Sequence, residues 1–312
     1  MRSYQAPLFS ILHFQFIIKF TSFPLLSFSS RILSLSIVIC ELSIVCREIV
    51  ILDQIKSYMS RPLIFITNDD GVIAKGIASL VEAARPFGDI VVIAPDKPQS
   101  GMGHAITIHD ILRLYPSDVF EGIETYACSG TPVDCVKLGV YEVLHRKPDL
   151  LLSGINHGAN TSTNVLYSGT MSAAVEGAME HIPSIGFSLD NFDHNADFSA
   201  AVSVAQQLIP AVLKSGLPKG VCLNVNIPNV TAEELKGIKV CRQAYAFWED
   251  RFDKRVDQFG KTYYWLSGSF DAKEEAQDTD LYAIENGYAS VVPTQFDLTA
   301  HDAIHTLTEQ LT

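Results

Sequence analysis

The chain has 312 residues, enough for one large domain or two small ones, and 47% of them are hydrophobic, which is ample for a core. Its formal net charge is −12, and its lysines and arginines form no basic run and no stripe interleaved with aromatic residues. This pattern excludes a protein that coats nucleic acid. It does not exclude small anionic substrates, because a bound cation can reverse the local electric field.

The cysteines give no sign of a metal cluster or a redox motif. They form no CxxC pair and no cysteine–histidine group with zinc spacing. We expect buried, reduced thiols in a cytoplasmic protein. The six are Cys40, Cys46, Cys128, Cys135, Cys222 and Cys241.

Residues 1–58 differ from the rest of the chain: they are rich in Phe, Ile, Leu and Ser and contain no glycine. A transmembrane helix needs about 20 apolar residues in a row, and charged residues such as Lys19, Arg31 and Glu41 interrupt this stretch. A secretory signal needs a small-residue cleavage site, and none follows the apolar run 9–18. We therefore expect no stable membrane insertion, and interpret 1–58 as a disordered extension or a mis-assigned start, with Met59 as the true first residue.

From residue 62 onward, short apolar runs alternate with helical patterns. Each apolar run ends in a polar or proline-containing loop, as buried parallel strands do. The order strand, helix, strand predicts an α/β fold, a Rossmann-like doubly wound and mostly parallel sheet, with its core over about 59–215. The predicted strands are 63–67, 89–94, 150–153 and 183–188, and the predicted helices are 76–85, 172–180 and 198–215.

The pattern loosens after residue 215. Strands are predicted at 220–227, 239–243, 261–267 and 289–293, and we expect them to form a β-rich C-terminal arm over about 216–300, followed by a tail at 301–312. The whole α/β unit would then span 59–300. Because such an arm commonly pairs with another subunit, we expect a homodimer or a homotetramer.

Polar side chains gather where the predicted strands end, which is where parallel α/β sheets bind ligands. Asp69 and Asp70 follow the first strand, and two adjacent carboxylates at a buried strand end are costly without a counter-charge. A hard divalent cation would supply that charge, with Ser100 and Asn156 from neighbouring loops adding neutral oxygens. The alternative is a simple turn followed by a helix cap, which Asp also favours.

A second polar cluster, Ser168-Gly169-Thr170, stands directly before a predicted helix. Such a turn presents backbone N–H groups and hydroxyls to an anion, and the helix dipole adds to the attraction. The alternative is a capped helix without a ligand. The similar Ser129-Gly130-Thr131 is predicted to be a helix start, with Asp134 in its first turn. A cation beside an anion-binding helix start is typical of phosphate-ester hydrolysis.

These motifs resemble the SurE family, the survival-protein nucleotidases, over about residues 62–300. The stretches that carry the resemblance are IFITNDDGVIAKGI (64–77), VVIAPDKPQSGMGHAIT (91–107), SGTPVDCVKLG (129–139), PDLLLSGINHGANTSTNVLYSGTMSAAVEGA (148–178) and DTDLYAIENGYASVVP (278–293). Family members usually begin just before the first strand, which favours Met59 as the start. One departure is Thr161-Ser162-Thr163, which stands where a glycine-containing turn is common.

The resemblance implies a 5′/3′-nucleotidase that uses one Mg²⁺ or Mn²⁺ per subunit and acts on nucleoside monophosphates, with short polyphosphate as a further substrate of some members. It also implies the family's Rossmann-like fold and oligomerising C-terminal arm. Matched residue by residue, the metal ligands would be Asp69, Asp70, Ser100 and Asn156, with the two aspartates catalytic. The phosphate would be bound by the motif residues Asn68, Gly71, Asn160, Ser168, Gly169 and Thr170.

Three questions stay open at the level of sequence. His104 and His157 are either proton donors to the leaving oxygen or surface-loop histidines. The attack on phosphorus is by metal-activated water or by an aspartate nucleophile, although Asp69-Asp70-Gly71 lacks the Asp-x-Asp of haloacid-dehalogenase-type phosphatases. A non-catalytic nucleotide-binding protein is the third possibility, and the presence of all four proposed ligands argues against it.

Overall fold

The computed structural model describes residues 61–312, so the predicted extension 1–58 and the start at Met59 lie outside the described residues. Within 61–312, nine strands form one sheet in the order β3-β4-β2-β1-β5-β6-β7-β11-β8. The six strands from β4 to β7 in this order run parallel. They are β4 (Glu124–Cys128), β2 (Asp89–Pro95), β1 (Leu63–Thr67), β5 (Leu150–His157), β6 (Ser184–Leu189) and β7 (Val221–Ile227).

The two flanks of the sheet contain the antiparallel pairings. On one side, β3 (Leu114–Pro116) pairs antiparallel with β4. On the other, β11 (Ala289–Gln295) pairs antiparallel with β7, and β8 (Ile238–Val240) pairs parallel with β11. The predicted Rossmann-like, mostly parallel fold is confirmed.

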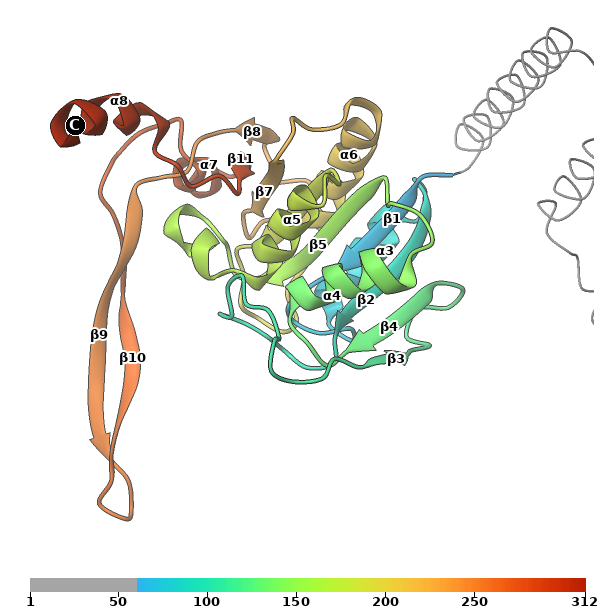
Figure 1. Cartoon of the computed structure of the whole chain (residues 1–312), viewed down its shortest axis with the longest axis horizontal. Coiled ribbons are helices and arrows are strands. Elements are labelled where there is room, and N and C mark those ends of the chain that lie inside the picture. Colours follow the sequence, from blue (N-terminus) through green and yellow to red (C-terminus); the bar gives the residue numbers. More distant parts are fainter. Residues whose placement is uncertain (1–60) are drawn as a thin grey trace, which may run out of the picture. The chain divides into compact units, whose positions relative to one another are not determined.

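Helices cover both faces of the sheet (Figure 1). On one face, α3 (Lys75–Ala84) packs beside α6 (Ser199–Ser215). On the other, α4 (Pro132–Leu138) packs beside α5 (Gly169–Met179). The remaining helical segments are η1 (Gly139–Val143), η2 (Ser162–Tyr167), α7 (Asp280–Glu285) and α8 (His301–Leu311).

The helical pattern of α3 shows how the sequence builds these layers. Ile77, Leu80, Val81 and Ala84 recur at helical spacing, and all four are fully buried against the sheet. Helix α4 begins where the sequence predicts, because Thr131 and Asp134 form a reciprocal capping box at its first turn. Ser129-Gly130-Thr131 is thus a helix start, as expected.

The arm contains fewer residues than the predicted range 216–300. Only β9 (Ala246–Val256) and β10 (Thr262–Ala272) leave the sheet, as a two-stranded antiparallel ribbon that projects from the domain (Figure 1). Strands β7 and β11 belong to the main sheet, because side chains such as Val225 and Val291 are buried in its core. The tail 301–312 forms α8, and no helix in the described range is long and apolar enough to cross a membrane.

The contact between α3 and β5 allows a test of this packing. A Cβ on Gly76 would lie 1.9 Å from the carbonyl oxygen of Ile155, a backbone atom that cannot move without shifting β5. Alanine favours a helix over glycine by about 1 kcal/mol, but the clash outweighs that gain. We expect Gly76→Ala to destabilise the protein by about 2 kcal/mol or more in urea unfolding. Ser79→Ala in the same helix should change little, and a Gly76→Ala variant of wild-type stability would contradict the packing.

Candidate active site

Three loops meet at the carboxyl edge of the central strands. The loop after β2 is joined to the loop after β1 by the Gln99 N–H, which donates to the carbonyl oxygen of Asp69 at 2.8 Å. The end of β5 is joined to the same loop by the His157 N–H, which lies 3.4 Å from Oδ2 of Asp70. Asn156 and Ser100 therefore each stand next to a residue that bonds to the loop of Asp69 and Asp70.

The carboxylate of Asp69 is buried and has a raised pKa. Its side chain is almost fully buried, at 3% exposure, and this burial raises its pKa from 3.8 to about 6. The Thr170 hydroxyl donates to Oδ1 of Asp69 at 2.5 Å and opposes the rise, while the neighbouring charge of Asp70 adds to it. Burial also raises the pKa of Asp70, and the hydrogen bond from the His157 N–H lowers it by less than burial raises it. Both carboxylates are thus held where a positive charge would stabilise them.

The other two predicted ligands offer neutral oxygens. The side-chain amide nitrogen of Asn156 donates to the carbonyl oxygens of His157 at 3.1 Å and Gly158 at 2.8 Å, which leaves its Oδ1 available. Ser100 is exposed in the turn next to Gln99. Two carboxylates, an amide oxygen and a hydroxyl suit a hard cation such as Mg²⁺ or Mn²⁺. Among the described residues, no group of three or more His, Cys, Asp or Glu could hold a metal ion, so a cation here would depend on the neutral oxygens of Asn156 and Ser100 as well as on the two aspartates.

The start of α5 abuts this carboxylate pair. The Ser168 hydroxyl caps the helix by accepting from the Met171 N–H at 3.0 Å. A Cβ on Gly169 would lie 2.7 Å from the Cβ of Asp69, so only glycine allows the helix to approach so closely. The Thr170 N–H also bonds to the Asp69 carboxylate. An anion drawn to this helix N-terminus would therefore lie directly beside the aspartates.

The loop after β2 closes the site on its remaining side. Gln99 of this loop bonds to Asp69. Four residues later the loop reaches the start of α5, where the Gly103 N–H donates to the carbonyl oxygen of Tyr167 at 3.2 Å. Tyr167 directly precedes the cap residue Ser168. The loops after β1 and β2 and the start of α5 thus form a closed ring around one small region of the sheet edge.

Asn68 and Gly71 shape this edge from within their own loop. The Asn68 side chain bonds to both backbone groups of Gly71, at 2.9 and 3.2 Å, and closes the turn that carries the aspartates. Gly71 has a φ of +102°, which side chains rarely adopt. Their contact with a substrate phosphate stays a prediction.

Asn160 is anchored by a buried polar network that the sequence analysis missed. Its side chain donates to Ser188 on β6 at 2.8 Å, and its N–H donates to Asn226 on β7 at 2.7 Å. Its carbonyl oxygen accepts from Asn224 at 2.8 Å. Asn224 and Asn226, at alternate positions of an otherwise apolar strand, were the feature of the sequence that could have predicted this network. A phosphate contact of Asn160 stays a prediction.

The departure at Thr161-Ser162-Thr163 has a structural role. Ser162 adopts a φ of +52°, the conformation that a glycine would take without strain. Its N–H donates to the buried Asp280 at 2.8 Å, and its hydroxyl lies 2.6 Å from the carbonyl oxygen of Ala246. This serine therefore fixes the base of the arm to the loop that leads into α5.

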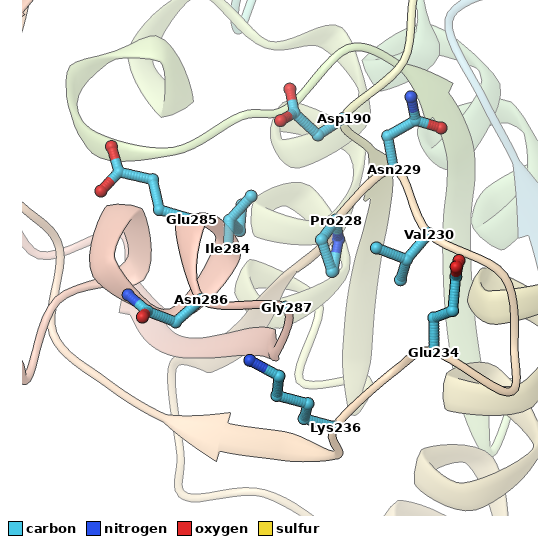
Figure 2. A pocket seen from close by; sticks show the side chains of 10 residues that line it. All are labelled: Asp190, Pro228, Asn229, Val230, Glu234, Lys236, Ile284, Glu285, Asn286 and Gly287. Atoms are coloured by element: carbon cyan, nitrogen blue, oxygen red, sulfur yellow. The ribbon is translucent and has the colours of Figure 1, made fainter.

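A hollow of about 590 Å³ lies further along the same edge, after β6 and β7 (Figure 2). Asp190, Glu234 and Glu285 line it together with Lys236. None of the predicted site residues borders it, and its excess of carboxylates does not suit a phosphate. It is separate from the ring around Asp69.

Comparisons with known proteins agree with the fold. A family model described as survival protein SurE matches residues 64–250. The chain belongs to the SurE family. Proteins named 5′-nucleotidase SurE from Christiangramia forsetii and Cytophaga hutchinsonii are 58% and 56% identical, and each alignment covers 79% of this chain and 96% or 95% of the relative. The crystal structure of the SurE protein from Aquifex aeolicus is 40% identical, has a TM-score of 0.70, and is matched over 99% of its length and 80% of this chain.

The raised pKa of Asp69 predicts how pH acts on the metal-free protein. Since the folded-state pKa of about 6 lies above the usual 3.8, the proton is bound more tightly in the folded state. The stabilisation of the folded state by this proton is complete below about pH 4 and is lost as the pH rises through about 6. We expect Asp69→Asn to gain stability over the metal-free wild type by about 1–3 kcal/mol between pH 4 and pH 7.

The measurement is urea unfolding of both proteins in EDTA at several pH values. Mn²⁺ should then raise the melting temperature of the wild type at pH 7 but not that of Asp69→Asn. A difference in stability that does not change with pH would contradict the burial of an ionisable Asp69.

Proposed function

We propose that this chain is a divalent-metal-dependent phosphatase of nucleoside monophosphates. The family and the relatives named 5′-nucleotidase support an enzyme of this class, a 5′-nucleotidase. The observation that carries the proposal is the contact between the buried Asp69 and the start of α5, because a cation held by the aspartates would lie beside an anion held by the helix start. Action on 3′-nucleotides and on short polyphosphate belongs to the same proposal.

In this proposal Asp69, Asp70, Ser100 and Asn156 hold one Mg²⁺ or Mn²⁺. When bound, the cation neutralises phosphoryl oxygens and makes a water molecule more acidic. The α5 N-terminus, with Ser168, Gly169 and Thr170, orients the phosphate and stabilises the charge that develops on its oxygens. Asp70 is less buried than Asp69, and in this proposal it takes the proton from the attacking water.

Two other functions fit the site less well. An aspartyl-phosphate mechanism needs an aspartate open to direct attack on phosphorus, whereas Asp69 is buried and hydrogen-bonded to Thr170. A non-catalytic nucleotide-binding protein would not need two desolvated carboxylates whose pKa values are raised by burial.

The activity test uses the full chain. Purified protein should release phosphate from AMP or GMP in the presence of Mn²⁺ or Mg²⁺, and should lose this activity in EDTA. Asp70→Asn should lower kcat/KM for AMP by about 100-fold or more, since it removes both a ligand and the proton acceptor. Asp118→Asn, in the loop after β3, serves as the control and should keep the wild-type activity. A fully active Asp70→Asn would contradict the proposal.

We further propose that the arm joins two copies of this chain, as a homodimer or within a homotetramer. The strand register puts Trp248, Phe252, Tyr264, Leu266 and Phe270 on one face of the ribbon, because Phe252 lies opposite Leu266 and Trp248 opposite Phe270. Four of the five are exposed by 49–67%. A lone hairpin with such a face is marginal in water, so a second subunit is its natural cover.

Multi-angle light scattering tests the assembly. The wild type should elute with the mass of two or four chains, and Leu266→Lys should dissociate it because the lysine places a charge in the apolar face. Ser267→Lys, on the opposite face of the ribbon, is the matched control and should keep the wild-type mass. A monomeric wild type at micromolar concentration would refute the arm's role.

A cytoplasmic location is part of the same proposal. In the described range, Cys128, Cys135 and Cys222 are buried free thiols and Cys241 is a half-buried one. Reduced thiols are typical of the cytoplasm.

A further inference from the structure

Glu176 on α5 is a buried carboxylate with two partners. Its side chain is 2% exposed, and His104 Nε2 lies 2.9 Å from Oε2. Lys137 Nζ lies 2.5 Å from Oε1. Burial raises the pKa of Glu176, but the bonds to His104 and Lys137 outweigh that effect and hold it below the usual value. Glu176 is therefore ionised. Lys137 alone would balance its negative charge, so the charge does not explain why His104 is also bonded to it.

An ionised carboxylate only accepts hydrogen bonds, which fixes the state of the His104 ring. Its Nε2 carries the hydrogen that is donated to Glu176. The other ring nitrogen, Nδ1, is then the one that can exchange a proton with a ligand. The His104 side chain is 37% exposed, so the ring is both oriented and reachable.

The position of His104 connects it to the candidate active site. It follows Gly103, which bonds to Tyr167 next to the phosphate-binding turn. Glu176 stands seven residues after Gly169 in α5, which is about two turns and therefore the same face of the helix. Gly169 is the residue pressed against Asp69. His104 thus lies beside α5: it bonds to the helix face that includes Gly169, and it directly follows the residue that bonds to the start of the helix.

His157, the other candidate of the sequence analysis, is placed differently. Its ring packs edge-on against Phe198 with centroids 5.2 Å apart, and its Nδ1 is buried without a partner in the described part of the chain. Its backbone N–H, and not its ring, bonds to Asp70. It has no carboxylate to orient a proton toward a substrate.

We propose that His104 is the general acid that protonates the leaving oxygen of the nucleoside, and that Glu176 is the residue that positions it. The inference rests on the proposed function. The oxygen of water attacks phosphorus and its proton passes to Asp70. The bond from phosphorus to the ester oxygen breaks, its electron pair stays on that oxygen, and His104 Nδ1–H supplies the proton. The nucleoside leaves as an alcohol, Asp70 returns its proton to water, and His104 takes one up.

The experiment compares leaving groups, because only a poor one needs the proton. Nucleoside alkoxide is a poor leaving group and p-nitrophenolate is a good one. His104→Ala and His104→Asn should lower kcat for AMP by about 100-fold or more, and kcat for p-nitrophenyl phosphate by only a few-fold. Glu176→Gln should produce a smaller loss with the same preference. His109→Ala, a histidine of the same loop, should leave both substrates unaffected.

The outcomes separate this inference from the proposed function. If the wild type releases no phosphate from AMP with Mn²⁺, the proposed function fails. If the wild type is active but folded His104 variants lose both substrates equally, or lose neither, His104 is not the acid. If Glu176→Gln affects both substrates equally while its circular dichroism and melting temperature match the wild type, Glu176 does not position the proton.

Discussion

The site depends on one contact: the carboxylate of Asp69 is pressed against the first turn of α5. Burial makes its ionised form costly, and the Thr170 hydroxyl offsets this only in part. The adjoining charge of Asp70 adds to the cost, so the pair favours a cation. The same contact puts the positive end of the α5 dipole beside the aspartates. A cation and a phosphate would then stabilise each other there.

The rest of the fold holds this contact in place. Gly169 permits the close approach, Gln99 fastens the loop after β2 to Asp69, and Gly103 fastens its far end to Tyr167. Behind these loops, the asparagines of β7 and the Ser162–Asp280 bond anchor the chain that leads into α5. The arm departs from that same anchor, so the segment that exposes the apolar ribbon also supports the turn proposed to bind phosphate.

Much of this arrangement could be predicted from sequence, and the failures have physical causes. Strands such as 63–67 and the face of α3 follow from apolar spacing, and the loops after β1, β2 and β5 are recognisable by their Asp, Ser and Asn content. The membership of β7 and β11 in the main sheet was missed, because only tertiary packing buries Val225 and Val291. The roles of Glu176, Asn226 and Asp280 were also missed, since each depends on a partner at least 36 residues away.

The claim that Asp69 and Asp70 form a cation site beside an anion site is tested most directly by Mn²⁺ binding. Electron paramagnetic resonance of the full chain should show one tightly bound Mn²⁺ per subunit at pH 7.5, absent from Asp69→Asn and Asp70→Asn. Adding AMP should alter the spectrum of the bound ion, because the phosphate would lie against it. No bound Mn²⁺ in the wild type, or equal binding by both variants, would contradict the account.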